Sequence, residues 1–451
     1  MGRAQIVQAE AARIAPHVDM NPVLLKPSTD TGSQVVLHGK PMANREAREY
    51  FADTDHLFGK ALESLQRLRA AHALIIMEGA GSCAEVNLRP RDFVNFRMAH
   101  AAEAPVILVA DIDRGGVFAQ IIGTLDLIPK EDRQRVAGII INRFRGDPDL
   151  FKNGIEFIEN RTGLPVLGLI PYFRHIQIDS EDGVPLDAVL DPPAGPEPGK
   201  INIGVIRLPH ISNFTDFNPF DRDAAVNLHY LARPRSLEGY DAIFLPGTKN
   251  GRFDMEWLNR TGWTAMLSKY VRDGGYLVGI CGGYQMLGNV IDDPCGIEGA
   301  PGETRCLGLL NVDTTLHREK ILSRSTGLWE QTGKKVEGYE IHMGVTKCGP
   351  GVHPVIRMLS QNDEPVDGFD GAASADGRIW GVYFHGLFDM PGFRHAFLRA
   401  IRADYRPGDS DGDTGPIAEF KNRQYDLLAE HFRTHLDMDR LLKILSLDTE
   451  S

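Results

Sequence analysis

Short, continuous apolar runs recur along the chain, and most end at a glycine, aspartate, asparagine or proline. Runs of this kind are typical of parallel strands that are covered on both faces. Stretches with helical patterning lie between them, for example residues 55–71 and 117–127. This alternation predicts an α/β protein built from doubly wound parallel sheets. The predicted strands are 73–77, 106–110, 136–141, 166–170, 201–206, 242–245 and 276–280.

The chain of 451 residues is long enough for two or more domains. Residues 191–200 read DPPAGPEPGK, a composition that cannot pack as a helix or as a central strand. This segment is predicted to be a linker. It separates a first domain at 1–190 from a second domain at 201–451, and an amphipathic helix is expected at about 418–447 in the second domain.

Charge and cysteine usage argue against several classes of protein. The chain has Asp+Glu 61 against Lys+Arg 49, and the net charge of -12 argues against nucleic acid as a partner. Its 5 cysteines are an odd number scattered along the chain, which disfavours a disulfide framework. No pair has CxxC spacing, which disfavours a structural zinc site. No apolar run approaches the length of a membrane span, and the first residues lack a secretory pattern. A cytoplasmic protein without membrane contact is expected.

The most informative segment is 274–288, GGYLVGICGGYQMLG. An apolar strand runs into Cys281, and Gly282 and Gly283 follow at the start of a helical pattern. This strand–turn–helix arrangement is a nucleophile elbow, in which glycines permit a strained turn and a close approach of substrate. Amides at the start of the helix, beginning with that of Gly282, lower the pKa of a thiol and stabilise an oxyanion. A buried structural cysteine at a tight turn is the alternative.

A thiolate nucleophile needs a base, and the segment 380–389, WGVYFHGLFD, supplies His385 at the end of another apolar strand. Taken alone, such a histidine is more often a structural residue of the core or surface, with its hydrogen bonds made, than a catalytic base. A third strand ends in the loop 246–250, PGTKN, where Gly247 and Thr248 offer backbone amides for an oxyanion hole. Together these segments predict a cysteine–histidine site for acyl transfer.

The sequences CGGYQ, LPGTKN and YFHGLFD together resemble a class I glutamine amidotransferase domain of the cobyric acid synthase and cobyrinic acid diamide synthase type. The resemblance implies that Cys281 attacks the side-chain amide of glutamine, that His385 carries protons to the leaving ammonia, and that Gln285 helps to hold glutamine. Class I domains typically have a glutamate two residues after the histidine, where this chain has Leu387. The cobyric acid synthase branch shares this departure, which implies a Cys–His dyad.

Two more segments of the second domain, 208–220 (LPHISNFTDFNPF) and 338–344 (GYEIHMG), resemble motifs of the same family. By its pattern alone, the first of these is a polar loop with buried aromatic residues. Met286 and Met343 are expected in the core, and for His342 a structural role is at least as well supported as a place in the site.

Polar groups also follow two predicted strands of the first domain. Glu78 comes directly after the strand 73–77, in MEGAGSCAEVNL, and DIDRGGVFAQ follows the next strand. A carboxylate at the carboxyl end of a parallel strand suits Mg²⁺ near phosphates, so Glu78 is predicted as a metal ligand. Asp111 and Asp113 are candidates for binding metal or orienting a nucleophile, and Arg114 for holding a phosphate or a substrate carboxylate. The alternative for the segment of Glu78 is a simple glycine-rich turn. The alternative for the segment of Asp111, Asp113 and Arg114 is a helix N-cap with a surface ion pair.

Two residues of the first domain are assigned by resemblance. Asn142, in NRFRGD, is similar to the nucleobase-contacting asparagine of dethiobiotin-synthetase-like ATP-binding domains. Lys26, in NPVLLKP, stands where that superfamily often has a phosphate-contacting lysine. In order and spacing, these segments with EGAGSCAEVNL and DIDRGGVFA resemble the cobyric acid synthase family over essentially the whole chain. The resemblance implies ATP and Mg²⁺ as co-substrate and metal, and no tightly bound prosthetic group.

The activity that the resemblance implies is ATP- and glutamine-dependent amidation of the b, d, e and g carboxylates of adenosylcobyrinic acid a,c-diamide, in cobalamin biosynthesis. The expected partners are small molecules, namely glutamine, ATP and the corrinoid diamide. Cobyrinic acid a,c-diamide synthase is a close alternative. A cysteine hydrolase of glutamyl peptides is another, although it leaves the first domain unexplained.

One departure from the family concerns its phosphate loop. The superfamily begins with a strand and a GxxxxxGK[ST] turn, and none of the Gly-Lys pairs of this chain, which start at Gly39, Gly59 and Gly333, fits that pattern. The first domain is therefore expected to lack this strand and loop, through a start-site error or a shortened gene product. Such a chain is expected to bind ATP poorly and to aggregate. A catalytically incomplete protein that keeps only glutaminase activity is thus a third alternative.

Overall fold

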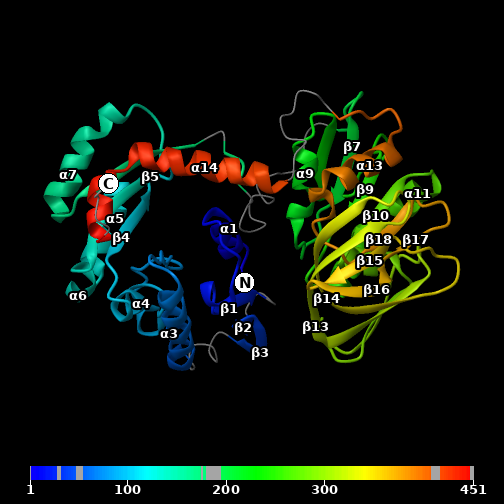
Figure 1. Ribbon diagram of the computed structural model, residues 1–451, viewed down its shortest axis with the longest axis horizontal. Coiled ribbons are helices and arrows are strands. Elements are labelled where there is room, and N and C mark those ends of the chain that lie inside the picture. The colour runs from blue at the N-terminus through cyan, green and yellow to red at the C-terminus, as the bar shows by residue number, and fades with distance from the viewer. Residues whose placement is uncertain are drawn as a thin grey trace. The chain divides into compact units, whose positions relative to one another are not determined.

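The computed structural model describes residues 2–27, 32–46, 54–173, 176–178, 195–407 and 417–446 (Figure 1). The chain divides into two compact units, Met1–Glu181 with Lys421–Ser451, and Asp182–Phe420. In the part that is described, no helix is both long enough and apolar enough to span a membrane.

The first unit has a small antiparallel sheet and a parallel sheet. β1, β2 and β3 form the antiparallel sheet, in which Val35 packs with Leu57 and Phe93, and the sequence did not predict it. The elements of this unit are α1 (Arg3–Ala11), η1 (Val18–Met20), β1 (Val23–Pro27), β2 (Gly32–Leu37), β3 (Lys40–Glu46), α3 (Thr54–Ala71), η2 (Arg89–Arg91), α4 (Phe96–Ala101), β4 (Val106–Asp111), α5 (Val117–Leu127), α6 (Lys130–Arg133), β5 (Val136–Phe144), η3 (Pro148–Phe151), α7 (Lys152–Thr162), β6 (Val166–Pro171), α14 (Ile417–His435) and α15 (Met438–Ile444).

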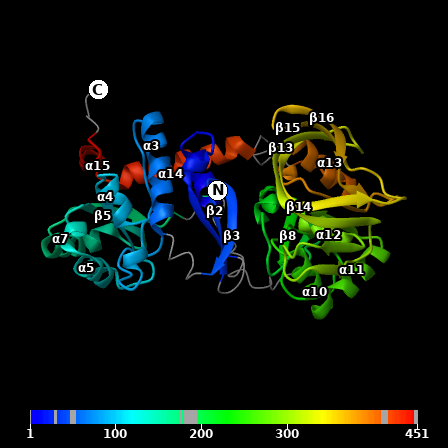
Figure 2. The ribbon, with the colours of Figure 1, turned by 90° about the horizontal axis from the view of Figure 1, so that it is seen from below.

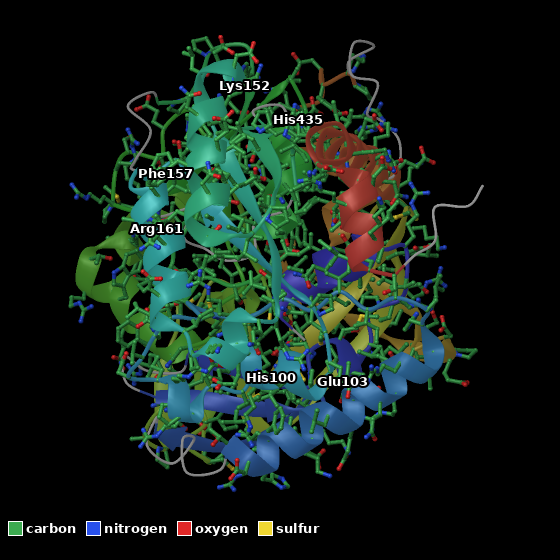
Figure 3. The ribbon with its side chains drawn as sticks, turned by 90° about the vertical axis from the view of Figure 1, so that its left-hand side faces the viewer. His100, Glu103, Lys152, Phe157, Arg161 and His435 are labelled. Atoms are coloured by element: carbon green, nitrogen blue, oxygen red, sulfur yellow. The ribbon has the colours of Figure 1, made fainter. Side chains whose placement is uncertain are left out.

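The parallel sheet of the first unit has the order β4-β5-β6, as the apolar runs predict. Ile139 and Ile141 of its central strand are fully buried. They pack in one cluster with Ile121 of α5 and Ile158 of α7. The buried residues of α5 recur every four positions, so one apolar stripe of the helix lies in this core. Figure 3 marks the course of α7 with Lys152, Phe157 and Arg161.

The predicted strand at 73–77 is wrong. No strand is assigned at 73–80 in the described structure, and Ile76 is 84% exposed. An apolar run becomes a strand only when its backbone groups find a neighbouring strand. Among the described residues, β4 pairs with β5 alone, and residues 73–80 pair with neither. Glu78 therefore follows an exposed segment and does not stand at the end of a strand.

The second unit is built around a six-stranded sheet of order β17-β18-β10-β9-β7-β8. β7 and β9 are buried at every position, because both faces of this sheet are covered, and their sequences are accordingly apolar except for Asn202. The elements of this unit are β7 (Ile201–Ile206), η4 (Phe214–Phe217), α9 (Asn218–Asp221), β8 (Val226–Leu231), β9 (Ala242–Leu245), α10 (Gly251–Thr261), α11 (Trp263–Arg272), β10 (Tyr276–Ile280), α12 (Gly282–Leu287), β11 (Val290–Asp293), β12 (Gly302–Arg305), β13 (Val312–Trp329), β14 (Lys335–Cys348), β15 (Ile356–Gln361), β16 (Glu364–Asp370), β17 (Ala372–Ala373), β18 (Ile379–Val382), η5 (Leu387–Asp389) and α13 (Pro391–Ile401).

A second, mostly antiparallel sheet completes this unit, and the sequence did not predict it. It runs β12-β11-β13-β15-β16, and β14 forms a long hairpin with β13. Figure 2 shows β13, β15 and β16 on one side of the unit and α10 and α11 on the other. The fold is therefore the predicted α/β arrangement with an added mixed sheet.

Most of α14, from Lys421 on, and all of α15 belong to the first unit, which differs from the predicted extension of the second domain to residue 451. Helix α14 ends at His435 (labelled in Figure 3), and α15 begins at Met438, so the expected single helix is broken. Between the two helices, Leu436 bridges Gly168 of β6, and the Asp437 amide donates to the Leu167 carbonyl at 2.7 Å. This segment covers the outer edge of the parallel sheet.

The predicted linker is only partly described, since residues 191–194 lie outside the described residues. Its second half packs on the second unit. The Asn202 side chain accepts from the Glu197 amide at 2.7 Å and donates to the Glu197 carbonyl at 3.0 Å. The second half of the predicted linker is therefore hydrogen-bonded to the start of β7 and is not an unattached linker.

Replacing Gly168 by alanine is expected to lower the free energy of unfolding of the first unit by about 2 kcal/mol. A Cβ at this position would lie 2.6 Å from the His435 carbonyl oxygen, so the segment that covers β6 must move. Denaturant unfolding would measure the effect. Gly123→Ala in α5 is the matched control, because its Cβ meets nothing within 4 Å. We expect the control to be neutral or slightly stabilising, and equal effects of the two changes would contradict this account.

Candidate active site

Three neighbouring strands of the second unit bring the predicted site segments together. β10 pairs in parallel with β9 on one side and with β18 on the other. The loop 246–250 follows β9, Cys281 follows β10, and His385 comes three residues after β18. Because the carboxyl ends of parallel strands meet at one edge, these three segments lie at the same edge of the sheet.

Cys281 stands at the sharp turn that the sequence predicts. Its φ of 52° and ψ of −109° are strained for a residue with a side chain, as at a nucleophile elbow. The turn is packed tightly against β9: a Cβ on Gly283 would lie 1.9 Å from the Leu245 carbonyl oxygen. The Cys281 Sγ lies 3.7 Å from the Ile341 carbonyl oxygen of β14. Packing thus fixes a nearly buried thiol in one position.

His385 is completely buried, and both of its ring nitrogens have polar partners. Nδ1 lies 2.7 Å from Asp216 Oδ2, and Nε2 lies 3.0 Å from Asn213 Nδ2. The ring stacks on Tyr339 with a centroid separation of 5.2 Å. Burial alone would lower the pKa of His385, but the Asp216 carboxylate and the neighbouring Cys281 raise this pKa to about 10. These surroundings therefore stabilise the imidazolium that forms when Nε2 takes a proton.

Asp216 and Asn213 are the site residues that the sequence reasoning missed. They come from the SNFTDF segment, which was noted as a motif without roles for its members. The signal available in the sequence was that Asn213 and Asp216, three positions apart, each directly precede a phenylalanine. Asp216 is 169 positions from His385, so no local pattern links the two.

The predicted glutamine-binding and oxyanion residues surround Cys281. Gln285 is buried in α12, and its Nε2 donates to the Tyr383 hydroxyl at 3.3 Å. A Cβ on Gly282 would lie 3.2 Å from the Thr248 backbone nitrogen, so these two parts of the predicted oxyanion hole are adjacent. A Cβ on Gly247 would lie 3.0 Å from the His385 ring. The backbone of the loop 246–250 therefore lies close to both Cys281 and His385.

The GYEIHMG segment forms part of β14 and borders the same site. Tyr339 exchanges backbone hydrogen bonds with His385, at 3.2 and 2.8 Å. His342 is buried, stacks on Tyr383 at 3.7 Å, and its Nδ1 lies 2.7 Å from the Gly344 carbonyl oxygen. These contacts give His342 a packing role.

In the first unit, Asp111 and Asn142 face each other at the carboxyl ends of β4 and β5. Arg143 Nη1 donates to Asp111 Oδ2 at 3.1 Å, and the Arg143 amide donates to Asn142 Oδ1 at 2.8 Å. The edge of this sheet therefore carries a carboxylate, an amide and a guanidinium close together.

Asp113 lies two residues further on and pairs with Arg145, whose Nε donates to Asp113 Oδ1 at 2.5 Å. This hydrogen bond lowers the pKa of Asp113, which keeps the carboxylate ionised. The Arg145 guanidinium also stacks on the Tyr172 ring at 3.6 Å. Arg143 and Arg145 were not singled out from the sequence. Arg114 is exposed and adds positive charge near Asp113.

The structure does not gather the other predicted residues of the first unit into this group. Glu78 is exposed, and its Oε2 accepts from Gln8 Nε2 at 2.6 Å. Lys26 lies on β1, where it pairs with Gln34 in the antiparallel sheet, and its side chain is outside the described part.

Mg²⁺ prefers carboxylate oxygens together with water and phosphate oxygens. Asp111 and Asp113 offer ligands of this type, so the residues fit the ion in donor chemistry. No group of three or more histidine, cysteine or acidic residues that would hold a metal ion alone occurs among the described residues. Two carboxylates suit a site in which the phosphates of a bound nucleotide supply further ligands to Mg²⁺.

Comparison with known proteins assigns the chain to a family. A CobB/CobQ-like glutamine amidotransferase domain matches residues 202–393, and an AAA domain matches residues 39–178. A cobyric acid synthase of Chlorobaculum tepidum is 54% identical over 450 residues, which cover 100% of this chain and 88% of the relative. The chain belongs to the cobyric acid synthase family.

Two more cobyric acid synthases support this assignment. The enzyme of Chlorobium phaeobacteroides is 55% identical over 99% of this chain and 88% of the relative. That of Syntrophobacter fumaroxidans is 43% identical over 99% of this chain and 89% of the relative. These relatives favour assignment to cobyric acid synthase over cobyrinic acid a,c-diamide synthase, the close alternative that the sequence left open. The predicted family, the α/β fold and the ligase class are confirmed.

Proposed function

We propose that this chain amidates the b, d, e and g carboxylates of adenosylcobyrinic acid a,c-diamide, with glutamine as nitrogen donor and ATP as energy source. The proposal rests on similarity to cobyric acid synthases over the whole chain, and on Cys281 and His385 at neighbouring strand ends. Within it, the first unit carries the ligase reaction and the second unit carries the glutaminase reaction.

In the glutaminase reaction, the Cys281 thiolate attacks the side-chain amide carbon of glutamine. Backbone amides around Gly247 and Gly282 stabilise the oxyanion that forms. The proton on His385 Nε2 passes to the amide nitrogen, the C–N bond breaks, and ammonia leaves a glutamyl thioester on Cys281. Water then hydrolyses the thioester to glutamate and restores the thiol. The covalent intermediate divides one difficult hydrolysis into two easier steps.

In the ligase reaction, ATP phosphorylates a corrinoid carboxylate, because a free carboxylate is a poor electrophile at neutral pH. Ammonia attacks the acyl phosphate, the C–O bond to phosphate breaks, and the amide forms. Asp111, Asp113 and Asn142 are the residues that we place at the nucleotide. Arg143 and Arg145 supply positive charge for phosphate or substrate carboxylate groups. Bound Mg²⁺ would neutralise charge on the phosphates.

Removal of divalent metal is expected to separate the two reactions. EDTA should abolish ATP-dependent amidation, because the nucleotide needs its metal, and leave glutamine hydrolysis measurable, because that site uses only protein groups. Glutamate release and ADP release, assayed on the same sample, test this expectation. A parallel loss of both activities on chelation, restored together by Mg²⁺, would count against separate sites.

The function is tested by incubating the full chain with glutamine, ATP, Mg²⁺ and the corrinoid diamide, and by following the corrinoid mass. Four successive conversions of carboxylate to amide, dependent on glutamine and ATP, are expected. In a parallel incubation with cobyrinic acid, amidation of its a and c positions alone would instead identify a diamide synthase. Glutamate release without any corrinoid product, under conditions where ATP binds, would refute the ligase assignment.

A further inference from the structure

The position two residues after His385 has no carboxylate. It is Leu387, which is 1% exposed and packs in the core of the second unit. The carboxylate that contacts His385 is that of Asp216, on η4 near the start of the unit. Its side chain is almost completely buried. The carboxylate that the sequence next to His385 lacks is thus supplied by Asp216, from a distant part of the unit's sequence.

The two oxygens of Asp216 have different partners. Oδ2 lies 2.7 Å from His385 Nδ1, and Oδ1 accepts from the Gly386 amide at 2.9 Å. The Asp216 amide in turn donates to the Asn213 carbonyl at 3.0 Å. The carboxylate therefore joins the imidazole to the backbone that follows it. Both the position and the rotation of the ring are fixed by this pair of contacts.

These contacts also select one tautomer of the neutral ring. A carboxylate accepts, so the proton lies on Nδ1, and Nε2 keeps its lone pair. The contacts of Asn213 support the same tautomer. The Tyr339 hydroxyl donates to Asn213 Oδ1 at 3.2 Å, so Asn213 Nδ2 is the atom that donates to His385 Nε2. Only this tautomer can take a proton at Nε2. Once Nε2 is protonated, the Asn213 amide can no longer donate to it.

We propose that Asp216 is the positioning carboxylate of the glutaminase site, and that the site is a Cys281–His385–Asp216 triad whose third member comes from the SNFTDF segment. The thiol proton of Cys281 moves to His385 Nε2 and later to the leaving amide nitrogen. Asp216 accepts the Nδ1–H hydrogen bond throughout and so keeps the ring in place. The inference rests on the proposed glutaminase step and deepens it.

The charges around His385 support this role. The titratable groups that face the ring are Asp216 from η4, Cys281 before α12 and Tyr339 from β14. Asp216 and Cys281 raise the pKa of His385 although burial opposes them. A raised histidine pKa stabilises the fold most below the unfolded value of about 6.5. That contribution is lost as the pH rises toward about 10, the pKa of the folded state.

Asp216→Asn tests the proposal. An amide at this position can donate to Nδ1 and so stabilise the wrong tautomer. Glutamine-dependent glutamate release should fall about 100- to 10,000-fold in kcat, while ATP-dependent amidation with added ammonium chloride remains. Asp216→Glu should recover part of the loss. Asp223→Asn is the matched control: its carboxylate accepts from Tyr405 at 2.5 Å, in the same part of the unit, and does not take part in the reaction.

Alkylation of Cys281 by iodoacetamide provides a readout independent of turnover and of the corrinoid. In Asp216→Asn, the rate at neutral pH should fall about tenfold, and the pH of half-maximal rate should move upward, because the imidazolium is less stable. Unchanged alkylation, or an unchanged glutamine-dependent kcat, would overturn the proposal. Equal loss of the glutamine- and ammonia-dependent activities with a lower Tm would also overturn it, since Asp216 would then be structural. If the ligase assignment alone is wrong, corrinoid amidation fails while the alkylation and glutamate results stand.

Discussion

Replacing Cys281 by alanine will abolish glutamine-dependent amidation and leave amidation with ammonium salts in place. The thiolate is the only group in this site that forms the covalent bond to glutamine in our proposal, so its loss should lower glutamate release at least about 1,000-fold. The ligase reaction in the first unit uses free ammonia and does not involve the thiol. Parallel assays of glutamate and amidated corrinoid, with glutamine or ammonium chloride as donor, measure the separation.

Cys295→Ala is the matched control for this change, because Cys295 is an exposed free cysteine of the same unit. It should keep both activities. Covalent labelling with a glutamine analogue should disappear in the Cys281 variant and persist in the control. Glutamine-dependent turnover by Cys281→Ala at the wild-type rate would place the nucleophile elsewhere.

Replacing Gly283 by alanine is expected to have the second largest effect. Its Cβ would lie 1.9 Å from the Leu245 carbonyl oxygen and 2.6 Å from the Leu245 carbonyl carbon. These atoms are backbone at the end of β9, which pairs with β10, so a rotamer change cannot relieve the clash. We expect the free energy of unfolding of the second unit to fall by about 3 kcal/mol or more. The displaced turn should also remove glutaminase activity.

Gly392→Ala in α13 adds the same methyl group where nothing lies within 4 Å, and it should change neither stability nor activity by much. Denaturant unfolding of both variants, followed by tryptophan fluorescence, compares the two sites. If Gly283→Ala unfolds like the control and still hydrolyses glutamine, α12 and β9 are not packed as closely as the structure has them.

The parallel strands could be predicted because their physical signal is local. β7, β9 and β10 match the predicted bounds, since strands covered on both faces must be apolar at nearly every position. The elbow at Cys281 was predicted for the same kind of reason, because glycines must follow a strand that turns sharply into a helix. The predicted strand at 73–77 failed because its apolar run finds no partner among the described strands.

The mixed sheet and the third member of the triad could not be predicted in this way. β13 and β16 are largely exposed on one face, so their sequences carry no continuous apolar run. Asp216 reaches His385 only because β7 and β18 belong to one sheet, with β10 and β9 between them. A hydrogen bond between residues so far apart in sequence is a property of the folded chain.

The first unit draws on both ends of the sequence, because the segment between α14 and α15 covers the edge of β6. The second unit is contiguous and is synthesised in full before that segment leaves the ribosome. We therefore expect the second unit to fold during translation, and the first unit to keep the outer edge of β6 open until the segment between α14 and α15 has left the ribosome. During this interval the nascent chain presents an unpaired strand edge to its neighbours. The speed at which this segment is translated should thus affect how much of the protein is recovered in soluble form.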